Sequence, residues 1–185
     1  MTKFSTSENL RMPAEWEKQK STWIAWPHNK KDWPNKFDFI PYTFAEIISY
    51  ISKDQVVNIL IENNALKKKA LSILKKFEVK FSNIRFNLCK TDRVWLRDSF
   101  PIFVKNNRNN KILIDWKFNS WAKYKNFKKD NKAYLKIKKT IKIKVIKPKF
   151  KNRKIVLEGG SIDVNGNGLL LTTKQCLISK IQERN

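Results

Sequence analysis

Val56-Val57-Asn58-Ile59-Leu60-Ile61 is the stretch that decides the fold class. Its apolar residues form a nearly continuous run, which is typical of a strand buried inside a sheet. Helical patterns lie on either side, over residues 37–52 and, after a helix N-cap at Asn63, over residues 65–77. A buried strand between two amphipathic helices predicts a mixed α/β fold.

Shorter patterns fill the rest of the chain, and strands outnumber helices. Residues 130–139 predict a further helix, and residues 140–146 alternate Ile or Val with Lys, which suits an exposed strand or a loop. Asn165-Gly166-Asn167-Gly168 predicts a hairpin turn. After the last strand pattern no closing helix is predicted, and no linker divides the chain. Strands are predicted over residues 21–26, 84–88, 102–105, 111–115, 154–157, 162–164 and 169–172.

Composition limits the class of protein. The 185 residues are 41% apolar, with 12 Phe and 7 Trp, which is enough for a core and excludes wholesale disorder. No apolar run reaches the roughly 18 residues of a membrane span, and the first ten residues lack a secretion signal, so a cytoplasmic protein is expected. Cys89 and Cys176 suggest no disulfide framework, and with His28 as the only histidine neither a metal nor a cofactor is expected.

The net charge of +24 is unusually high for a chain of this length. Lysines neutralise phosphates, so a binding protein for nucleic acid or acidic partners is one interpretation. However, the lysines are accompanied by many Asn and Ile, as the base composition of an AT-rich genome would produce. Arginine, the better bidentate phosphate ligand, is scarce. A general compositional bias is therefore preferred, and nucleic acid is not expected as a partner.

The segment Thr91-Asp92-Arg93-Val94-Trp95-Leu96-Arg97-Asp98-Ser99-Phe100-Pro101 is the first candidate for chemistry. Trp95 precedes the carboxylate of Asp98 by three residues, within an otherwise apolar, strand-like run. A planar cation such as guanidinium would use both, because it can lie on the aromatic face and bind the carboxylate in bidentate fashion. The alternative is a strand-end carboxylate that pairs with a neighbouring arginine.

Glu158 is the second candidate, between the apolar run Ile155-Val156-Leu157 and the pair Gly159-Gly160. A buried strand would meet a flexible turn there, and glycines permit the close approach of a ligand or backbone. A glutamate so placed can orient a catalytic base or accept a proton, and the alternative is a carboxylate that caps the N–H groups of the turn. No Ser-His-Asp arrangement or phosphate-binding loop is present. The residues thus indicate a site for a small cation without a visible nucleophile.

Five blocks, in the right order, resemble the agmatine deiminases, which form one family with the bacterial-type peptidylarginine deiminases. The stretch from Thr91 to Pro101 resembles the family's Trp-x-Arg-Asp segment. Phe118-Asn119-Ser120-Trp121-Ala122-Lys123-Tyr124 resembles its Phe-Asn-x-Trp-Gly-x-Lys-Tyr block, with Ala122 in place of the usual glycine. The other blocks are the Trp-rich residues 12–34, residues 156–163 and residues 170–177, followed by Arg184-Asn185.

The resemblance implies an α/β propeller (the pentein fold), of which residues 1–185 would form roughly the N-terminal half of the blades, as part of a single domain. It implies hydrolysis of a guanidinium group to a ureido group and ammonia through a thiouronium intermediate on cysteine. In agmatine deiminases, agmatine becomes N-carbamoylputrescine for putrescine biosynthesis. Asp98 matches the carboxylate that grips the guanidinium, Trp95 a tryptophan that packs on the substrate, and Glu158 the glutamate that supports the general acid/base histidine.

The resemblance also implies that the catalytic His, a second Asp and the nucleophilic Cys follow the Arg-Asn block. None matches a residue here: His28 belongs to the first block, Cys176 aligns with a strand position and Cys89 with no catalytic position. Residues 1–185 are therefore expected to be inactive alone, whether as a truncated product or as half of a split enzyme with a complementing C-terminal fragment. Agmatine is favoured over peptidyl-arginine as the substrate. The alternative class is a non-enzymatic relic whose basic surface binds nucleic acid or acidic partners.

Overall fold

The computed structural model describes residues 9–181 and 184–185. The chain is a mixed α/β protein, as predicted, and it divides into two compact units. The terminal unit comprises Met1–Glu17, Arg97–Lys125 and Ile137–Asn185, and the central unit comprises Lys18–Leu96 and Asn126–Lys136. The propeller and the single-domain organisation that the resemblance implies stay predictions.

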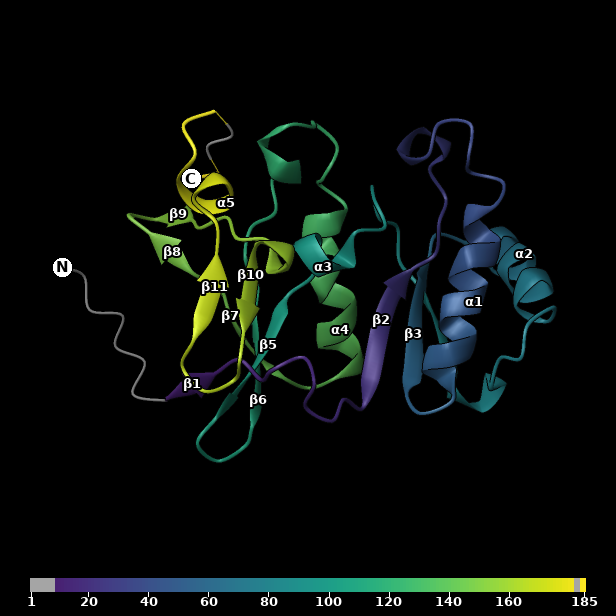
Figure 1. Cartoon of the computed structure of the whole chain (residues 1–185), viewed down its shortest axis with the longest axis horizontal. Coiled ribbons are helices and arrows are strands. Elements are labelled where there is room, and N and C mark those ends of the chain that lie inside the picture. Colours follow the sequence, from purple (N-terminus) through teal and green to yellow (C-terminus); the bar gives the residue numbers. More distant parts are fainter. Residues whose placement is uncertain (1–8, 182–183) are drawn as a thin grey trace. The chain divides into compact units, whose positions relative to one another are not determined.

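The central unit is built on a parallel sheet in the order β2-β3-β4, of which Figure 1 labels β2 and β3. β3 (Val56–Ile61) lies between β2 (Ser21–Ala25) and β4 (Ile84–Leu88), and most of its side chains are buried, which confirms the strand predicted from its apolar run. α1 (Ile40–Ser52) and α2 (Asn64–Leu74) connect the three strands, because parallel neighbours need a crossover.

One apolar core joins α1, α2 and the sheet of the central unit. The predicted N-cap of α2 is confirmed, since the N–H of Leu66 donates a hydrogen bond to Asn63 Oδ1 at 2.8 Å. The core residues are Trp26, Ala45, Ile48, Val57, Ile59, Ile61, Ala70, Leu74 and Ile84.

The terminal unit contains a four-stranded sheet in the order β1-β5-β6-β7. β5 (Ile102–Asn106) pairs antiparallel with β1 (Leu10–Arg11) and with β6 (Lys111–Ile114), and β6 pairs parallel with β7 (Lys144–Ile146). Residues 140–146 are thus a strand in their second half. The core of this unit consists of Ile102, Val104, Ile112, Ile114 and Ile162.

Two hairpins complete the strands of the terminal unit. β8 (Lys149–Phe150) pairs with β9 (Arg153–Lys154), and β10 (Ile162–Val164) pairs with β11 (Leu170–Thr172). The predicted turn between β10 and β11 is confirmed, and its glycines have left-handed backbones, with φ of 71° and 93°. Short 3-10 turns lie at Lys30–Asp32, Phe81–Asn83, Ser120–Ala122, Asp130–Lys132 and Gly159–Ser161.

Two expectations about local structure are wrong, and a third is confirmed in part. α3 (Leu96–Ser99) is one helical turn within the run that the sequence predicts to be strand-like, because a four-residue helix is too short to show a helical period. α5 (Lys174–Ile178) follows β11, although no helix is predicted after the last strand pattern. Cys176, which the resemblance aligns with a strand position, lies in this helix, and Thr173 is its N-cap. α4 (Tyr134–Thr140) is shorter than the predicted helix, whose first residues form a 3-10 turn.

None of the helices within the described residues is long and apolar enough to cross a membrane.

Candidate active site

Asp98 and Glu158 lie around Gly159-Gly160 in the terminal unit. The N–H of Gly160 donates a hydrogen bond to Asp98 Oδ1 at 3.1 Å, and Arg97 Nε donates to the Gly159 carbonyl at 3.1 Å. A Cβ on Gly160 would lie 2.0 Å from Asp98 Oδ1, and one on Gly159 would lie 2.5 Å from the Arg97 carbonyl oxygen. Only glycine permits this approach, which is the kind of role that the sequence predicts for the pair.

Asp98 is a half-buried carboxylate that accepts from two donors among the described residues. One is Gly160, and the other is Trp121, whose indole N–H is its only polar group. Burial raises the pKa of Asp98, although the hydrogen bonds from Trp121 and Gly160 and the charges of Arg97 and Arg184 lower it. The alternative interpretation, a simple pair with a neighbouring arginine, gains no support, since Arg97 pairs with Glu15 and Arg93 with Asp32.

Glu158 is 2% exposed and forms an ion pair with Arg184, whose Nε donates to Oε1 at 2.9 Å. Burial raises the pKa of Glu158, Arg184 lowers it through its hydrogen bond and charge, and the charge of Asp98 raises it. The interpretation of Glu158 as a turn cap is wrong, because its carboxylate accepts no capping hydrogen bond from the turn that follows. It is instead half of a buried ion pair.

The dipeptide Arg184-Asn185 is anchored by its neighbours. Asn119 Nδ2 donates to the Arg184 carbonyl at 3.2 Å. The Asn185 side chain accepts from the Val156 N–H at 2.7 Å and donates to the Val156 carbonyl at 3.1 Å. Its amide thus forms the pair of hydrogen bonds that the backbone of an adjacent strand would form with Val156. Val156 also forms an isolated parallel bridge with Lys117. The strand predicted over residues 154–157 is therefore present only as the end of β9 and this bridge. Sequence reasoning noted the Arg-Asn block but assigned it no contact.

The Ser120–Ala122 turn has an unusual backbone. Ser120, Trp121 and Ala122 have φ of 56°, 60° and 54°, in the left-handed region that costs about 1–2 kcal/mol per non-glycine residue. Ser120 is fully buried, and its Oγ has no hydrogen-bond partner among the described residues. The Trp121 ring lies edge-to-face with Phe118 and Tyr124, at centroid distances of 5.1 and 6.1 Å. Trp121 was missed as a site residue, although alanine in place of the family's glycine was a signal that this backbone is unusual.

Trp95 belongs to the central unit, so the structure brings together two of the three predicted site residues, Asp98 and Glu158. Its ring is 40% exposed and lies 5.6 Å from the ring of Trp33, centroid to centroid, at an interplanar angle of 50°. This tilted contact supports the indole while much of it stays accessible to a ligand.

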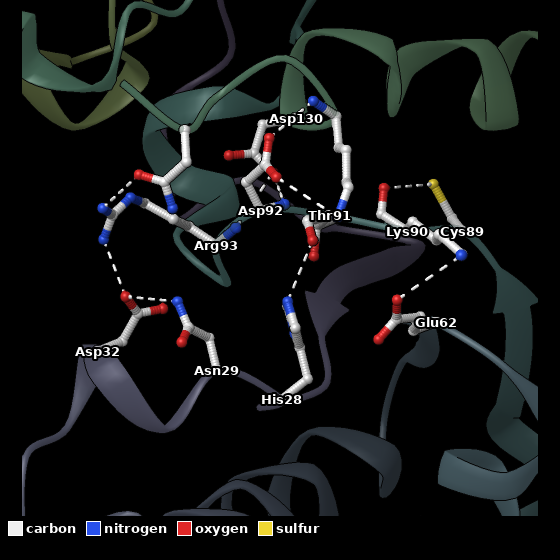
Figure 2. Close-up of polar contacts among 12 residues, drawn as sticks. His28, Asn29, Asp32, Glu62, Cys89, Lys90, Thr91, Asp92, Arg93 and Asp130 are labelled. Carbon is white, nitrogen blue, oxygen red and sulfur yellow. Dashed lines mark hydrogen bonds and ion pairs between the residues drawn. The ribbon is translucent and has the colours of Figure 1, made fainter. Parts of the chain in front are cut away.

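A polar network in the central unit fixes the segment before Trp95 (Figure 2). Asp130 Oδ1 accepts from the N–H groups of Asp92 and Arg93, at 2.7 and 3.3 Å, and the Asp92 carboxylate accepts from the Lys129 N–H at 2.8 Å. Asp130 is 1% exposed, and burial raises its pKa to about 6 in spite of these two hydrogen bonds. Its Oδ2 has no hydrogen-bond partner within the described part of the chain.

Arg93 and His28 extend this network toward the end of β2. Arg93 Nη1 donates to Asp32 Oδ1 and Nη2 to Asn126 Oδ1, both at 2.9 Å. The ring nitrogens of His28 lie 3.1 Å from the carbonyl oxygens of Trp26 and Thr91, so the ring bridges two backbone segments. Figure 2 shows the contact with Thr91. His28 therefore has a structural task, which agrees with its place in the first sequence block.

Both cysteines are free. Burial raises the pKa of the Cys89 thiol, and a raised pKa leaves less of the reactive thiolate at neutral pH. Among the residues that the structure describes, no group of three or more His, Cys, Asp or Glu side chains could hold a metal ion.

A family model described as Porphyromonas-type peptidyl-arginine deiminase matches residues 11–185. The chain therefore belongs to this family, as the sequence blocks indicate.

Curated relatives of the chain bear the name agmatine deiminase. The protein of Pseudomonas aeruginosa (strain LESB58) is 28% identical over 178 residues, which are 94% of this chain and 46% of the relative. That of Ectopseudomonas mendocina (strain ymp) is 30% identical over 185 residues, covering 97% of this chain and 48% of the relative. The chain thus spans about half the length of the curated relatives it matches.

Solved structures of agmatine deiminases resemble this chain in fold. The agmatine deiminase of Enterococcus faecalis matches with a TM-score of 0.80 and 26% identity, over 95% of this chain and 46% of that one. A cysteine-to-serine variant of the C. jejuni agmatine deiminase, with substrate bound, matches with a TM-score of 0.76 and 26% identity, over 95% of this chain and 49% of that one.

Proposed function

We propose that this chain is the guanidinium-binding part of a guanidine-group hydrolase of the agmatine deiminase type, which converts agmatine and water to N-carbamoylputrescine and ammonia. The observation that carries the proposal is the pairing of Asp98 with Gly160, beside the buried Glu158. Asp98 is the residue that binds the substrate guanidinium, and Trp95 packs against it. Agmatine fits such a site because it is a small molecule with a planar cation at one end.

The chemistry of Asp98 suits this task. Its carboxylate is held by two fixed donors and has further lone pairs for a guanidinium. Charge-assisted hydrogen bonds contribute about 1.5–3 kcal/mol each, and a bidentate pair also sets the plane of the cation. Because burial raises the pKa of Asp98, binding is expected to weaken as the pH falls through that pKa.

In this proposal Glu158 does not contact the substrate and acts through another residue. Its ion pair with Arg184 holds the carboxylate in one orientation, and the resemblance gives it the role of supporting the general acid/base histidine. That histidine and the nucleophilic cysteine match no residue of 1–185, so these residues alone are expected to form no ureido product from agmatine. Mixing with a complementing fragment that supplies both groups should restore activity, and Asp98→Asn should then abolish it.

The binding half of the proposal is tested on residues 1–185 directly. Agmatine is titrated into ¹⁵N-labelled protein, with putrescine, which lacks the guanidinium, as the ligand control. Asp98→Asn is expected to weaken agmatine binding at least tenfold, since it removes a charge-assisted pair. Asp163→Asn, on the exposed face of β10, is the matched control and should leave binding unchanged. Agmatine that binds the wild type no better than putrescine would contradict the proposal.

Peptidyl-arginine is the alternative substrate within the family. The curated relatives above are named agmatine deiminase, which supports agmatine for this chain. In the complemented enzyme, release of ammonia from agmatine but not from an arginine-containing peptide is expected, and the reverse preference would favour the alternative.

A second class of function rests on the net charge of +24. A non-enzymatic protein that binds nucleic acid or acidic partners would lose affinity steeply between 50 and 200 mM salt. A steep loss of binding to nucleic acid over this range, with no effect of agmatine on the protein, would favour this class over the hydrolase.

A further inference from the structure

We propose that Trp121 is a positioning residue for Asp98: the left-handed turn Ser120–Ala122 aims its indole N–H at the carboxylate that binds the guanidinium. The inference deepens the proposed function and rests on it for the role of Asp98. Trp121 itself is not assigned a contact with the reacting atoms.

The hydrogen bonds of Asp98 come from two different elements. Gly160 donates from the turn that follows Glu158, at 3.1 Å, and Trp121 donates from the Ser120–Ala122 turn. A carboxylate offers about four lone-pair positions, so two fixed donors leave room for the two N–H groups of one guanidinium. Two donors from separate elements also fix the plane of the carboxylate, which a single donor does not.

The backbone of the turn supports a specific task for Trp121. Three successive non-glycine residues are left-handed, and the buried Ser120 Oγ has no partner among the described residues. Both features are unfavourable, and such strain persists only where the surroundings hold it, commonly at functional sites. The surroundings here are the Asn119 side chain, which accepts from the Ala122 N–H at 3.1 Å, and the edge-to-face contacts of the Trp121 ring with Phe118 and Tyr124.

Trp121→Phe separates the N–H from the ring. The phenyl ring retains the aromatic contacts, while the donor to Asp98 is lost. The other charged groups that act on Asp98 are Arg97, Arg184 and Glu158, and they are the same in wild type and variant. The smaller phenyl ring would bury Asp98 less and lower its pKa, whereas loss of the N–H raises it, so a rise in the Asp98 midpoint reports on the lost N–H.

The test is a pH titration of the Asp98 side-chain carboxyl ¹³C signal in residues 1–185. Trp121→Phe is expected to move the Asp98 midpoint to higher pH, because a donor to the ionised form is lost. It is also expected to weaken agmatine binding about 3- to 10-fold, the equivalent of one lost hydrogen bond. Trp16→Phe, in the same unit and 76% exposed, is the control and should change neither quantity. A midpoint that Trp121→Phe leaves in place would overturn the inference.

A second measurement does not depend on the fold of the Trp121 variant. In the wild type, the indole ¹H–¹⁵N signal of Trp121 should shift with pH as Asp98 titrates, and Asp98→Asn should make it insensitive to pH. An indole signal that does not follow Asp98 also overturns the inference. If both titrations behave as expected but the wild type binds no agmatine, the proposed function fails while the Trp121–Asp98 pair stands.

Discussion

Asp130 joins the Asp92-Arg93 backbone to its own 3-10 turn, and burial raises its pKa to about 6. Between its ordinary pKa of 3.8 and about 6, the folded protein holds a proton on Asp130 that the unfolded chain releases. The stability that this proton contributes is present below that range and is lost as the pH rises through it.

Asp130→Asn keeps an acceptor for the two N–H groups and removes the titration. From pH 3.5 to 7, we expect the wild type to lose up to about 3 kcal/mol of unfolding free energy relative to the variant, measured by urea denaturation at each pH. Asp163→Asn, at an exposed position, serves as the control. A constant difference between wild type and Asp130→Asn across this range would contradict the assignment.

Ala122 has φ of 54° without being glycine. Ala122→Gly should relieve the left-handed strain, which exceeds the extra entropy that glycine gains in the unfolded chain, and stabilise the protein by about 0.5–1 kcal/mol. Ala65→Gly, at an exposed position of α2, is the matched control and should destabilise by a similar amount. Equal effects of the two substitutions in thermal unfolding would show that the strain at Ala122 is not relieved by glycine.

At the scale of elements, the Glu158–Arg184 ion pair joins the 3-10 turn at Gly159 to the Arg-Asn dipeptide. Arg184→Met leaves a buried carboxylate without its cation, which should cost about 3–5 kcal/mol of unfolding free energy at pH 7. The pKa of Glu158 should rise further without Arg184, so the loss should diminish as the pH falls and Glu158 is protonated.

The double variant Glu158→Gln/Arg184→Met removes both charges and should recover most of that loss. Double-mutant cycles at pH 5 and pH 7 measure the coupling. Additive effects of the two single substitutions would show that the pair contributes no coupling energy.

Sequence patterns predicted the elements that have a clear period. β3 is long enough to show a continuous apolar run, and α2 is long enough to show apolar residues at helical spacing. Asn63 is a common N-cap residue, so it marked the start of α2 in the sequence. α3 was missed because four residues carry no period and Val94-Trp95-Leu96 resembles a strand. The candidate site was predicted in part: Asp98 and Glu158 do lie around Gly159-Gly160, whereas the contacts of Arg184 and Trp121 join residues distant in sequence, which a pattern of neighbours does not reveal.

At the scale of the whole molecule, the net charge of +24 acts on stability as well as on binding. Like charges repel in the compact state, and the repulsion is screened as the Debye length falls from about 30 Å at 0.01 M salt to about 8 Å at 0.15 M. We expect NaCl to raise the midpoint of thermal unfolding over this range. Choline chloride at matched ionic strength should act alike, and a midpoint that falls with both salts would contradict dominance of net repulsion over the ion pairs.

The two compact units differ in how they draw on the chain. The sheet and both helices of the central unit come from residues 21–88, one continuous stretch, whereas β1 of the terminal unit pairs with β5 and Glu158 pairs with Arg184. On the ribosome, where chains emerge from the N-terminus, the sheet and the helices α1 and α2 of the central unit can fold while Leu10 still has no partner strand. The proposed guanidinium-binding site around Asp98 is assembled late, because Glu158 receives its counterion only when synthesis reaches residue 184. A nascent chain from which residue 136 has emerged but residue 184 has not would carry a folded central unit and an unfinished site.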